Sequence, residues 1–298
     1  MVGTLERGLI DIDRCSGGVD LRLTIETGQS YLWRGEGGQL YEEIPPNWYY
    51  IVLDGEYLRV KQTDRGLEWE STSDGESLLC HLLRLNDDLY EIFETIPSDK
   101  WVTAAVDKYL GMRLVQDPTF PCLISFICST QMRVERIHRM VSNLSERFGP
   151  AVEVDGRLYH GFPKAEHLAE VSEEELRSMS LGYRAPYVID TANLVVTGEL
   201  HPEDVASLEY EDARAELTRF VGVGNKVADC VLLFSLGYLE AVPLDTWIQR
   251  MIEERYPWCN KGNYHETSRA IRDYFGETYA GYAQTYLFHY FRSGADME

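Results

Sequence analysis

The sequence predicts an α+β fold in which an N-terminal antiparallel sheet packs on a mostly α-helical core. Two observations carry this prediction: apolar and polar residues alternate with period two in the first part of the chain, and a helical period replaces it after about residue 75. The 298 residues suffice for two domains of roughly 150 residues each. We expect a sheet domain over residues 1–115 and a helical domain over 116–298, with no internal repeat and no long linker.

Three segments carry the strand signals. Residues 19–25 alternate strictly between apolar and polar side chains, which predicts a strand with one wet face. Residues 49–53 and 56–61 flank Asp54-Gly55, a dipeptide typical of two-residue hairpin turns. The glycine-rich segment 35–38 predicts another turn, so these segments together indicate an antiparallel sheet.

The helical signals follow in order. Four leucines of residues 78–83 share one helical face, and residues 98–101 start another helical stretch. After Asp117-Pro118 one long apolar-periodic run extends over 121–148. A capping box at Ser172–Glu175 opens a further helix, and two more are predicted over 211–220 and 225–236. Another begins at Asp245, with Trp247, Ile248, Met251 and Ile252 on one face. The final helix is predicted over 279–291, and we expect it to pack back on the N-terminal domain.

The charge balance leaves the partner open. The formal net charge is −21, and a strongly acidic chain is ordinarily a poor binder of nucleic acid because phosphate repels it. At about 1 M salt, however, the Debye length is about 3 Å and surface carboxylates are screened. The many carboxylates and scarce lysines favour a salt-loving cytoplasm over an ordinary acidic protein, and both interpretations stay open.

The six cysteines form no CxxC pair and no zinc or iron–sulfur spacing, and no signal peptide precedes them. We therefore expect a reducing cytoplasm. No apolar run approaches about 18 residues, so we expect no membrane partner.

The most informative segment is Phe220-Val-Gly-Val-Gly-Asn-Lys-Val-Ala-Asp-Cys230. It is not a P-loop, because its glycines are too close together and no Ser or Thr follows the lysine. It is not a dinucleotide fingerprint either, because a helix precedes it. A helix, a tight turn and a second helix remain, and the free N–H groups at the start of the second helix can bind a phosphodiester without any net charge.

Lys226 lies in the first turn of that second helix, and Asp245 is the expected N-cap of the next one. An amine is a nucleophile when it is neutral, and a carboxylate kept ionised by amide hydrogen bonds stabilises positive charge. This pair suits attack on a sugar carbon. The residues alone favour the alternative, a phosphate-neutralising lysine and a plain capping aspartate.

Several motifs in one order resemble the helix-hairpin-helix DNA glycosylases, and most closely the 8-oxoguanine DNA glycosylases. The resemblance covers nearly the whole chain. The motifs are Thr27-Gly-Gln-Ser-Tyr-Leu-Trp33, Gln116-Asp-Pro118, Ser125-Phe-Ile-Cys-Ser129, Leu181-Gly-Tyr-Arg-Ala185, Gly222-Val-Gly-Asn-Lys-Val-Ala-Asp-Cys230, Val242-Pro-Leu-Asp245, and Gly281-Tyr-Ala-Gln284 with Leu287-Phe288.

The resemblance implies a base-excision repair enzyme, a bifunctional DNA glycosylase and AP lyase that flips 8-oxoguanine out of duplex DNA. Lys226 attacks C1′ and forms a Schiff base, while Asp245 stabilises the charged sugar. The carbonyl of Gly28 accepts from N7–H, which 8-oxoguanine has and guanine lacks. Gln284 binds the base edge, and Cys230 and Phe288 sandwich the ring. Without the resemblance, Cys230 and Phe288 would be interpreted as core residues.

The resemblance also implies DNA contacts. Tyr183 fills the base stack, Arg136 and Arg184 read the opposite cytosine, and Gln131 lies near the estranged base. Their alternatives are a core tyrosine and solvated arginines. The hairpin residues Gly222, Gly224 and Val227 bind phosphate, and carbonyls of Thr218, Phe220 and Val223 hold a monovalent cation.

Three positions depart from the family pattern. Gln131-Met132-Arg133 replaces an asparagine run, Trp247 replaces a histidine, and Val221 replaces a proline. The first makes the preference for cytosine less certain, and the second removes a phosphate contact.

The expected partner is double-stranded DNA containing oxidised guanine, acted on by a cytoplasmic monomer that requires no cofactor. The composition together with the resemblance indicates a halophilic archaeon as the source. Two alternatives remain open: a glycosylase for another damaged purine, such as an alkylated one, and a noncatalytic DNA-binding module. Lys226 argues against the first, since several alkylbase glycosylases lack this lysine. Asp245, Gly28 and Gln284 argue against the second.

Overall fold

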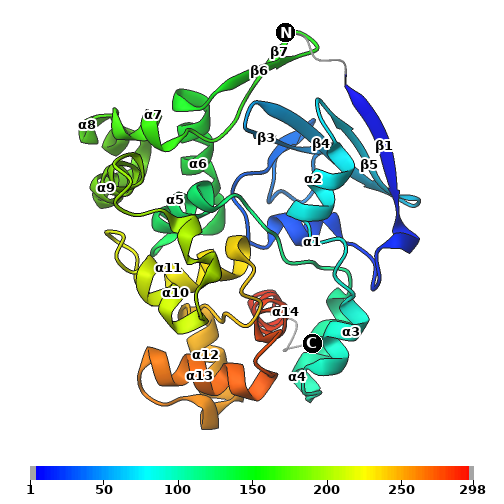
Figure 1. The fold of residues 1–298 in the computed structure, drawn as a ribbon. Coiled ribbons are helices and arrows are strands. Elements are labelled where there is room, and N and C mark those ends of the chain that lie inside the picture. The colour runs from blue at the N-terminus through cyan, green and yellow to red at the C-terminus, as the bar shows by residue number, and fades with distance from the viewer. Residues whose placement is uncertain (1–4, 295–298) are drawn as a thin grey trace.

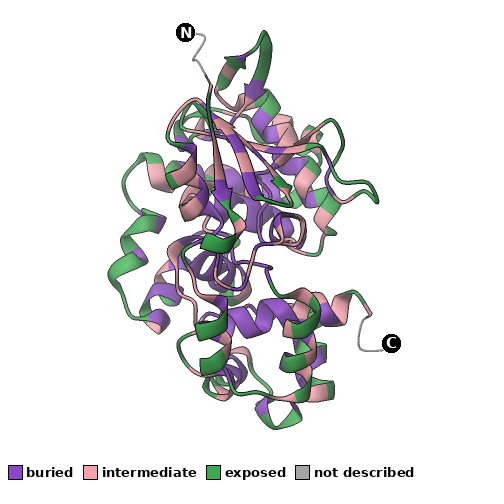
Figure 2. Cartoon of the chain, turned by 90° about the vertical axis from the view of Figure 1, so that its right-hand side faces the viewer, coloured by how far each residue is buried: buried purple, intermediate pink, exposed green. Residues whose placement is uncertain are grey.

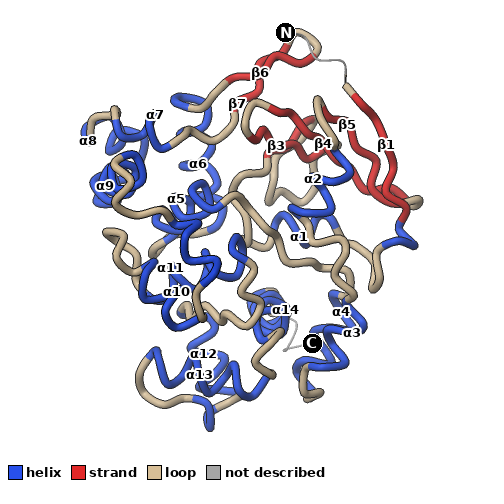
Figure 3. The backbone as a smooth tube through the Cα atoms, in the orientation of Figure 1, coloured by secondary structure: helices blue, strands red, loops and turns tan. Residues whose placement is uncertain are grey.

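The computed structural model describes residues 5–294 and confirms the α+β fold class (Figure 1). A five-stranded antiparallel sheet of order β1-β5-β4-β3-β2 lies in the N-terminal part, and helices dominate the rest (Figure 3). A second, two-stranded sheet pairs β6 with β7. The strands are β1 (Glu6–Asp11), β2 (Arg34–Glu36), β3 (Trp48–Leu53), β4 (Glu56–Thr63), β5 (Gly66–Ser71), β6 (Ala151–Val154) and β7 (Arg157–His160).

The α-helices precede, follow and interrupt these strands in the chain. They are α1 (Leu21–Glu26), α2 (Gly75–Leu82), α3 (Leu89–Thr95), α4 (Lys100–Tyr109), α5 (Thr119–Ser129), α6 (Val134–Phe148), α7 (Ala165–Ala169), α8 (Glu173–Leu176), α9 (Ala185–Val196), α10 (Tyr210–Leu217), α11 (Asn225–Val231), α12 (Thr246–Arg255), α13 (Tyr264–Phe275) and α14 (Ala280–Arg292). None of the described helices is long and apolar enough to cross a membrane.

The hairpin predicted around Asp54-Gly55 is confirmed as β3–β4. Both turn residues have positive φ, 48° for Asp54 and 85° for Gly55, as a type I′ turn requires. Leu53 pairs with Glu56 across the turn. The strand β2 occupies 34–36, so the glycine turn begins at Gly37, later than expected.

The strand predicted over residues 19–25 is wrong, because the segment forms helix α1. Asp20 caps this helix by accepting from the Leu23 N–H at 2.8 Å. Leu21, Thr24 and Ile25 are buried, which is the i, i+3, i+4 pattern of a helix. Over so few residues, the same apolar positions fit both the two-residue period of a strand and the 3.6-residue period of a helix.

The single run predicted over 121–148 is also wrong, because a loop at residues 130–133 divides it into α5 and α6. Gln131 has φ 57°, a left-handed conformation that ends α5 without any glycine or proline. The hairpin β6–β7 was not predicted, although its turn Asp155-Gly156 carries the same signal as Asp54-Gly55.

The other predicted helices are confirmed. Ser172 caps α8 by accepting from the Glu175 N–H, as a capping box requires. Asp99 caps α4 and Asp245 caps α12. The final helix α14 packs against α4, α12 and α13.

One hydrophobic core runs through the sheet and the helices. Figure 2 shows buried residues gathered between the layers and exposed residues on the outside. The guanidinium of Arg113 is fully buried and donates to backbone carbonyls of Ser16, Gly18, Arg84 and Asp87 at 2.8–3.0 Å. These carbonyls satisfy the cation, since buried charges need such partners.

Candidate active site

A cavity of about 850 Å³ lies where the N-terminal segment, the α5–α6 loop, α11, the start of α12 and α14 meet. Segments far apart in the chain therefore share one cavity. Its lining includes every predicted catalytic and base-pocket residue and the predicted DNA contact Gln131: Gly28, Gln131, Lys226, Cys230, Asp245, Gln284 and Phe288.

Lys226 lies in the first turn of α11, two residues after the N-cap Gly224. Its Nζ donates to Ser129 Oγ at 3.4 Å and lies 5.3 Å from the centre of the Phe126 ring. The amine thus faces the end of α5 on the cavity wall. Such an amine is accessible to a reacting carbon in the cavity.

Asp245 is half-buried at the N-terminus of α12, where its Oδ1 accepts from the Ile248 N–H at 2.8 Å. Burial raises the pKa of this carboxyl, while the Ile248 hydrogen bond and the charge of Lys226 oppose the rise. The amide hydrogen bond expected at this carboxylate is therefore present, although burial has the larger effect on the direction of its pKa shift. Lys226 and Asp245, which we call the reactive pair, line one cavity from two helix starts.

Gly28 has φ 93°, and a Cβ at this position would lie 3.1 Å from Val134 Cγ2. The backbone therefore adopts a conformation that favours glycine. Cys230 lies one turn after Lys226, is buried, and has a pKa that burial raises to about 11. A neutral, apolar thiol of this kind suits contact with a flat ring.

Gln284 and Phe288 are one turn apart on α14. Gln284 is buried and accepts from the Thr285 hydroxyl at 3.4 Å. Phe288 is half-buried, and the guanidinium of Arg292 lies 5.7 Å from the centre of its ring.

A second group of predicted residues meets around Thr130, and we call Thr130, Gln131, Tyr183 and Arg184 the Thr130 cluster. The Tyr183 ring is 48% exposed, and its hydroxyl lies 3.2 Å from Thr130 Oγ1. Arg184 is buried instead, donates to the Thr130 carbonyl, and stacks on Tyr183 at 4.3 Å. Gln131 is exposed.

Arg136 lies apart from this cluster, exposed in the first turn of α6. The two arginines that the sequence treated as equivalent are thus in different environments. Arg136 is a solvated helix residue, whereas Arg184 is part of the packing.

The hairpin joins α10 to α11. Gly222 has φ 81°, and a Cβ there would lie 2.5 Å from the Tyr187 ring, whereas a Cβ on Gly224 would meet nothing within 4 Å. The turn is therefore open at Gly224. The Val227 side chain is buried, so only its backbone can face a phosphate.

The segment predicted to hold a cation follows the C-terminus of α10. The carbonyl of Phe220 accepts from the Val223 N–H at 3.1 Å, Thr218 is the C-cap of α10, and Val223 is buried. No group of three or more His, Cys, Asp or Glu side chains within residues 5–294 could hold a metal ion.

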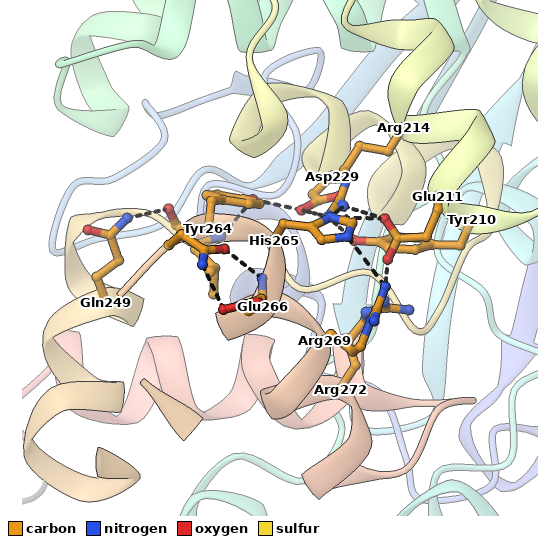
Figure 4. Close-up of polar contacts among 12 residues, drawn as sticks. Tyr210, Glu211, Arg214, Asp229, Gln249, Tyr264, His265, Glu266, Arg269 and Arg272 are labelled. Carbon is orange, nitrogen blue, oxygen red and sulfur yellow. Dashed lines mark hydrogen bonds and ion pairs between the residues drawn. The ribbon is translucent and has the colours of Figure 1, made fainter. Parts of the chain in front are cut away.

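A buried polar network supports α11 from behind (Figure 4). Asp229 accepts from the hydroxyls of Tyr210 at 2.7 Å and Tyr264 at 2.6 Å. Its pKa is raised to about 6 by burial, which these two hydrogen bonds and the charge of Arg214 oppose. The network connects α10, α11 and α13.

The sequence did not predict the contacts of two cavity residues, and it predicted the wrong environment for a third. Arg292 donates to the Thr27 carbonyl at 3.4 Å, and Ser129 accepts from Lys226. No motif marks either contact, because each depends on tertiary placement. Trp247 is 47% exposed at the cavity, so the prediction that it shares the buried face of Ile248 and Met251 is wrong.

Two family models match this chain. The family model described as HhH-GPD superfamily base excision DNA repair protein matches residues 124–277. A second model, described as 8-oxoguanine DNA glycosylase, N-terminal domain, matches residues 12–123.

Three relatives are similar over most of this chain. N-glycosylase/DNA lyase OGG1 of Arabidopsis thaliana is 30% identical over 90% of this chain and 76% of its own length. N-glycosylase/DNA lyase of Saccharomyces cerevisiae is 35% identical over 70% of this chain and 59% of its own. The solved complex of Clostridium acetobutylicum 8-oxoguanine glycosylase/lyase with double-stranded DNA containing cytosine opposite 8-oxoguanine superposes with a TM-score of 0.81, at 26% identity over 98% of both chains.

The two family models together thus match residues 12–277, which hold most of the sheet and of the helical core. The chain belongs to the HhH-GPD superfamily of base-excision DNA repair proteins and carries the N-terminal domain of the 8-oxoguanine DNA glycosylases.

Proposed function

We propose that this protein removes 8-oxoguanine from duplex DNA in base-excision repair and then cleaves the strand, as a DNA glycosylase and AP lyase. One observation carries the proposal: the reactive pair and the residues suited to holding a flat base line the same cavity. The 8-oxoguanine glycosylase/lyase of Clostridium acetobutylicum, which is similar over nearly the whole chain, supports the substrate class.

The cavity residues suggest the order of bond changes. The neutral Lys226 amine attacks C1′ as the N-glycosidic bond breaks, and the base leaves with the bonding electrons and takes up a proton. Positive charge on the sugar is stabilised by the Asp245 carboxylate. Ring opening gives a Schiff base between C1′ and Nζ, and loss of a proton from C2′ expels the 3′ phosphate.

Recognition of the lesion rests on one proton. The Gly28 carbonyl accepts from N7–H of 8-oxoguanine, whereas N7 of guanine is an acceptor and would repel it. A wrong base leaves a buried acceptor unpaired, which costs roughly 1–3 kcal/mol. Gln284 holds the base edge, and Cys230 and Phe288 contact the two faces of the ring.

The damaged nucleotide reaches this cavity only after it is flipped out of the duplex. The exposed Tyr183 fills the gap in the stack, Gln131 and Arg136 face the opposite strand, and the buried Arg184 holds the Thr130 carbonyl beside them. Backbone amides of the hairpin at Gly222, Gly224 and Val227 bind the phosphate.

The test is covalent trapping. In high salt, the protein is incubated with a duplex containing one 8-oxoguanine opposite cytosine, and borohydride is added. We expect a covalent complex that Lys226→Gln abolishes and that an undamaged duplex does not give. An intact strand and base would contradict the proposal and favour an enzyme for another damaged purine or a noncatalytic DNA-binding module.

We further propose that the protein works as a cytoplasmic monomer, without a required cofactor, and that the domain boundary lies near residue 115. Carbonyls of Thr218, Phe220 and Val223 lie beyond the C-terminus of α10, the negative end of that helix, which suits a monovalent cation. Such a cation would fix the turn and neutralise nearby phosphate.

The net charge of −21 supports a halophilic archaeal source. In that environment surface carboxylates are screened. The test is the thermal midpoint of unfolding in dilute buffer and at about 2 M salt, and we expect the higher midpoint at high salt. Equal midpoints in the two buffers would contradict a halophilic source.

A further inference from the structure

Asp229 is fully buried one helical turn after Lys226, and the proposed reaction does not use it. Two tyrosines from different helices donate to it. Tyr210 of α10 donates to Oδ1 at 2.7 Å, and Tyr264 of α13 donates to Oδ2 at 2.6 Å. The pair is matched in residue type, partner and distance, so any difference between the two has to come from their other contacts.

Tyr264 has such a contact. Its hydroxyl oxygen accepts from the backbone N–H of Leu244 at 3.2 Å. Tyr210 interacts instead with Arg214 and Arg272, which lie on α10 and α13 and not in the loop before α12. One hydroxyl therefore connects α11 to that loop (Figure 4).

Leu244 immediately precedes Asp245 and is buried. Its carbonyl also has a partner, because Gln249 Nε2 donates to it at 3.3 Å. Hydrogen bonds thus fix both the N–H and the carbonyl of Leu244, and this fixes the position at which α12 starts. Asp245 in turn accepts from the Ile248 N–H.

We propose that Tyr264 is a positioning residue for base excision: its hydroxyl couples the helix that carries Lys226 to the loop that carries Asp245. The inference rests on the proposed function. Without the hydroxyl, a buried N–H at Leu244 loses its acceptor, and the loop must shift to find another. Small displacements between reacting groups slow chemistry strongly, even where binding is retained.

The experiment compares Tyr264→Phe with Tyr210→Phe in the full-length protein, on a duplex containing one 8-oxoguanine opposite cytosine. Three quantities are measured: the single-turnover rate constant of base release, the dissociation constant for the duplex, and the thermal midpoint. Each variant removes one hydroxyl from Asp229, so we expect both midpoints to decrease, and Tyr264→Phe more, because it also leaves the Leu244 N–H without its acceptor. Neither ring lines the cavity, so we expect dissociation constants within about two-fold of wild type.

The rate constant distinguishes the two. We expect it to fall about tenfold or more in Tyr264→Phe and less than about two-fold in Tyr210→Phe, as the loss of alignment predicts. Equal rate constants in the two variants, or a Tyr264→Phe loss carried entirely by weaker binding, would overturn the inference while wild-type excision upholds the proposed function. A wild-type protein that leaves the lesion in place would overturn both.

Discussion

The reactive pair and the Thr130 cluster both reach the cavity, the cluster through Thr130 and Gln131, but they are built in different ways. Lys226 and Asp245 stand at two helix starts, and the hydroxyl of Tyr264 connects them by contacting both the buried Asp229 and the Leu244 N–H. In the Thr130 cluster, Gln131 and Tyr183 are exposed, and the chain beside them has positive φ at Gln131 (57°) and Ser180 (72°). Bond making needs fixed distances, whereas docking on DNA needs projecting groups on irregular backbone.

The largest effect is expected from Asp245→Asn. Asparagine caps a helix as well as aspartate does, so α12 should remain intact, while loss of the carboxylate should lower the excision rate by about 10²–10³-fold. Because burial raises the pKa of Asp245 above its ordinary 3.8, acidification should protonate it and remove activity at a pH above that value. A single-turnover pH profile measures both effects, and the variant should lack this acid limb.

Asp245→Ala is the companion variant. It removes the charge and the cap together, so it should lose the same activity and also about 1 kcal/mol of stability. An asparagine variant that unfolds as readily as the alanine variant would contradict this separation of the two roles.

Arg184→Ala should affect stability where Arg136→Ala does not. Arg184 is buried and donates to Thr130, so its removal should cost about 2 kcal/mol, while the exposed Arg136 should change stability by less than about 0.5 kcal/mol. Chemical denaturation of both variants measures the difference. Equal free energies of unfolding would mean that Arg184 belongs with the solvated docking residues.

Gly28→Ala should lower 8-oxoguanine excision about tenfold. Its φ of 93° disfavours alanine, and the new Cβ would press on Val134, turning the carbonyl that accepts from the base. Gly55→Ala is the matched control, since Gly55 has φ 85° with open space around it and lies in a distant hairpin. If Gly55→Ala slowed excision as much as Gly28→Ala does, backbone strain alone, and not the position of the Gly28 carbonyl, would explain the loss.

Tyr183→Ala should give the smallest change, about a five-fold slower excision, because base stacking on an aromatic ring contributes roughly 1–3 kcal/mol, part of which remaining neighbours replace. The ring is half exposed, so the thermal midpoint should stay within about 1 °C of wild type. Tyr183→Phe keeps the ring and should retain the wild-type rate. A large loss of stability in the alanine variant would place Tyr183 in the core instead.

The sequence predicted the parts of the fold that rest on local chemistry. Asp54-Gly55 specified a hairpin because both residues tolerate positive φ, and Asp245 specified a helix start because its side chain caps one. It failed where local patterns are ambiguous. Residues 19–25 fit two periods, and Gln131 breaks a helix without being a typical breaking residue.

For the site, the resemblance brought together residues that the cavity also brings together, from Gly28 to Phe288. The contacts that support them could not be predicted. Asp229 and Tyr264 are 35 positions apart, and Arg292 reaches Thr27 across nearly the whole chain. Only the packing of α10, α11 and α13 decides that Asp229 meets two hydroxyls. Nor could the sequence predict that Arg184 is buried while Arg136 is exposed.

The buried guanidinium of Arg113 has a consequence for how the chain folds. Its carbonyl partners come from two separate segments, Ser16 and Gly18 in one and Arg84 and Asp87 in the other. A buried cation with half of these partners missing would be costly, so a partly assembled state is disfavoured. Both segments must therefore assemble together around Arg113, and we expect residues 16–18 and 84–87 to lose their structure in the same cooperative step.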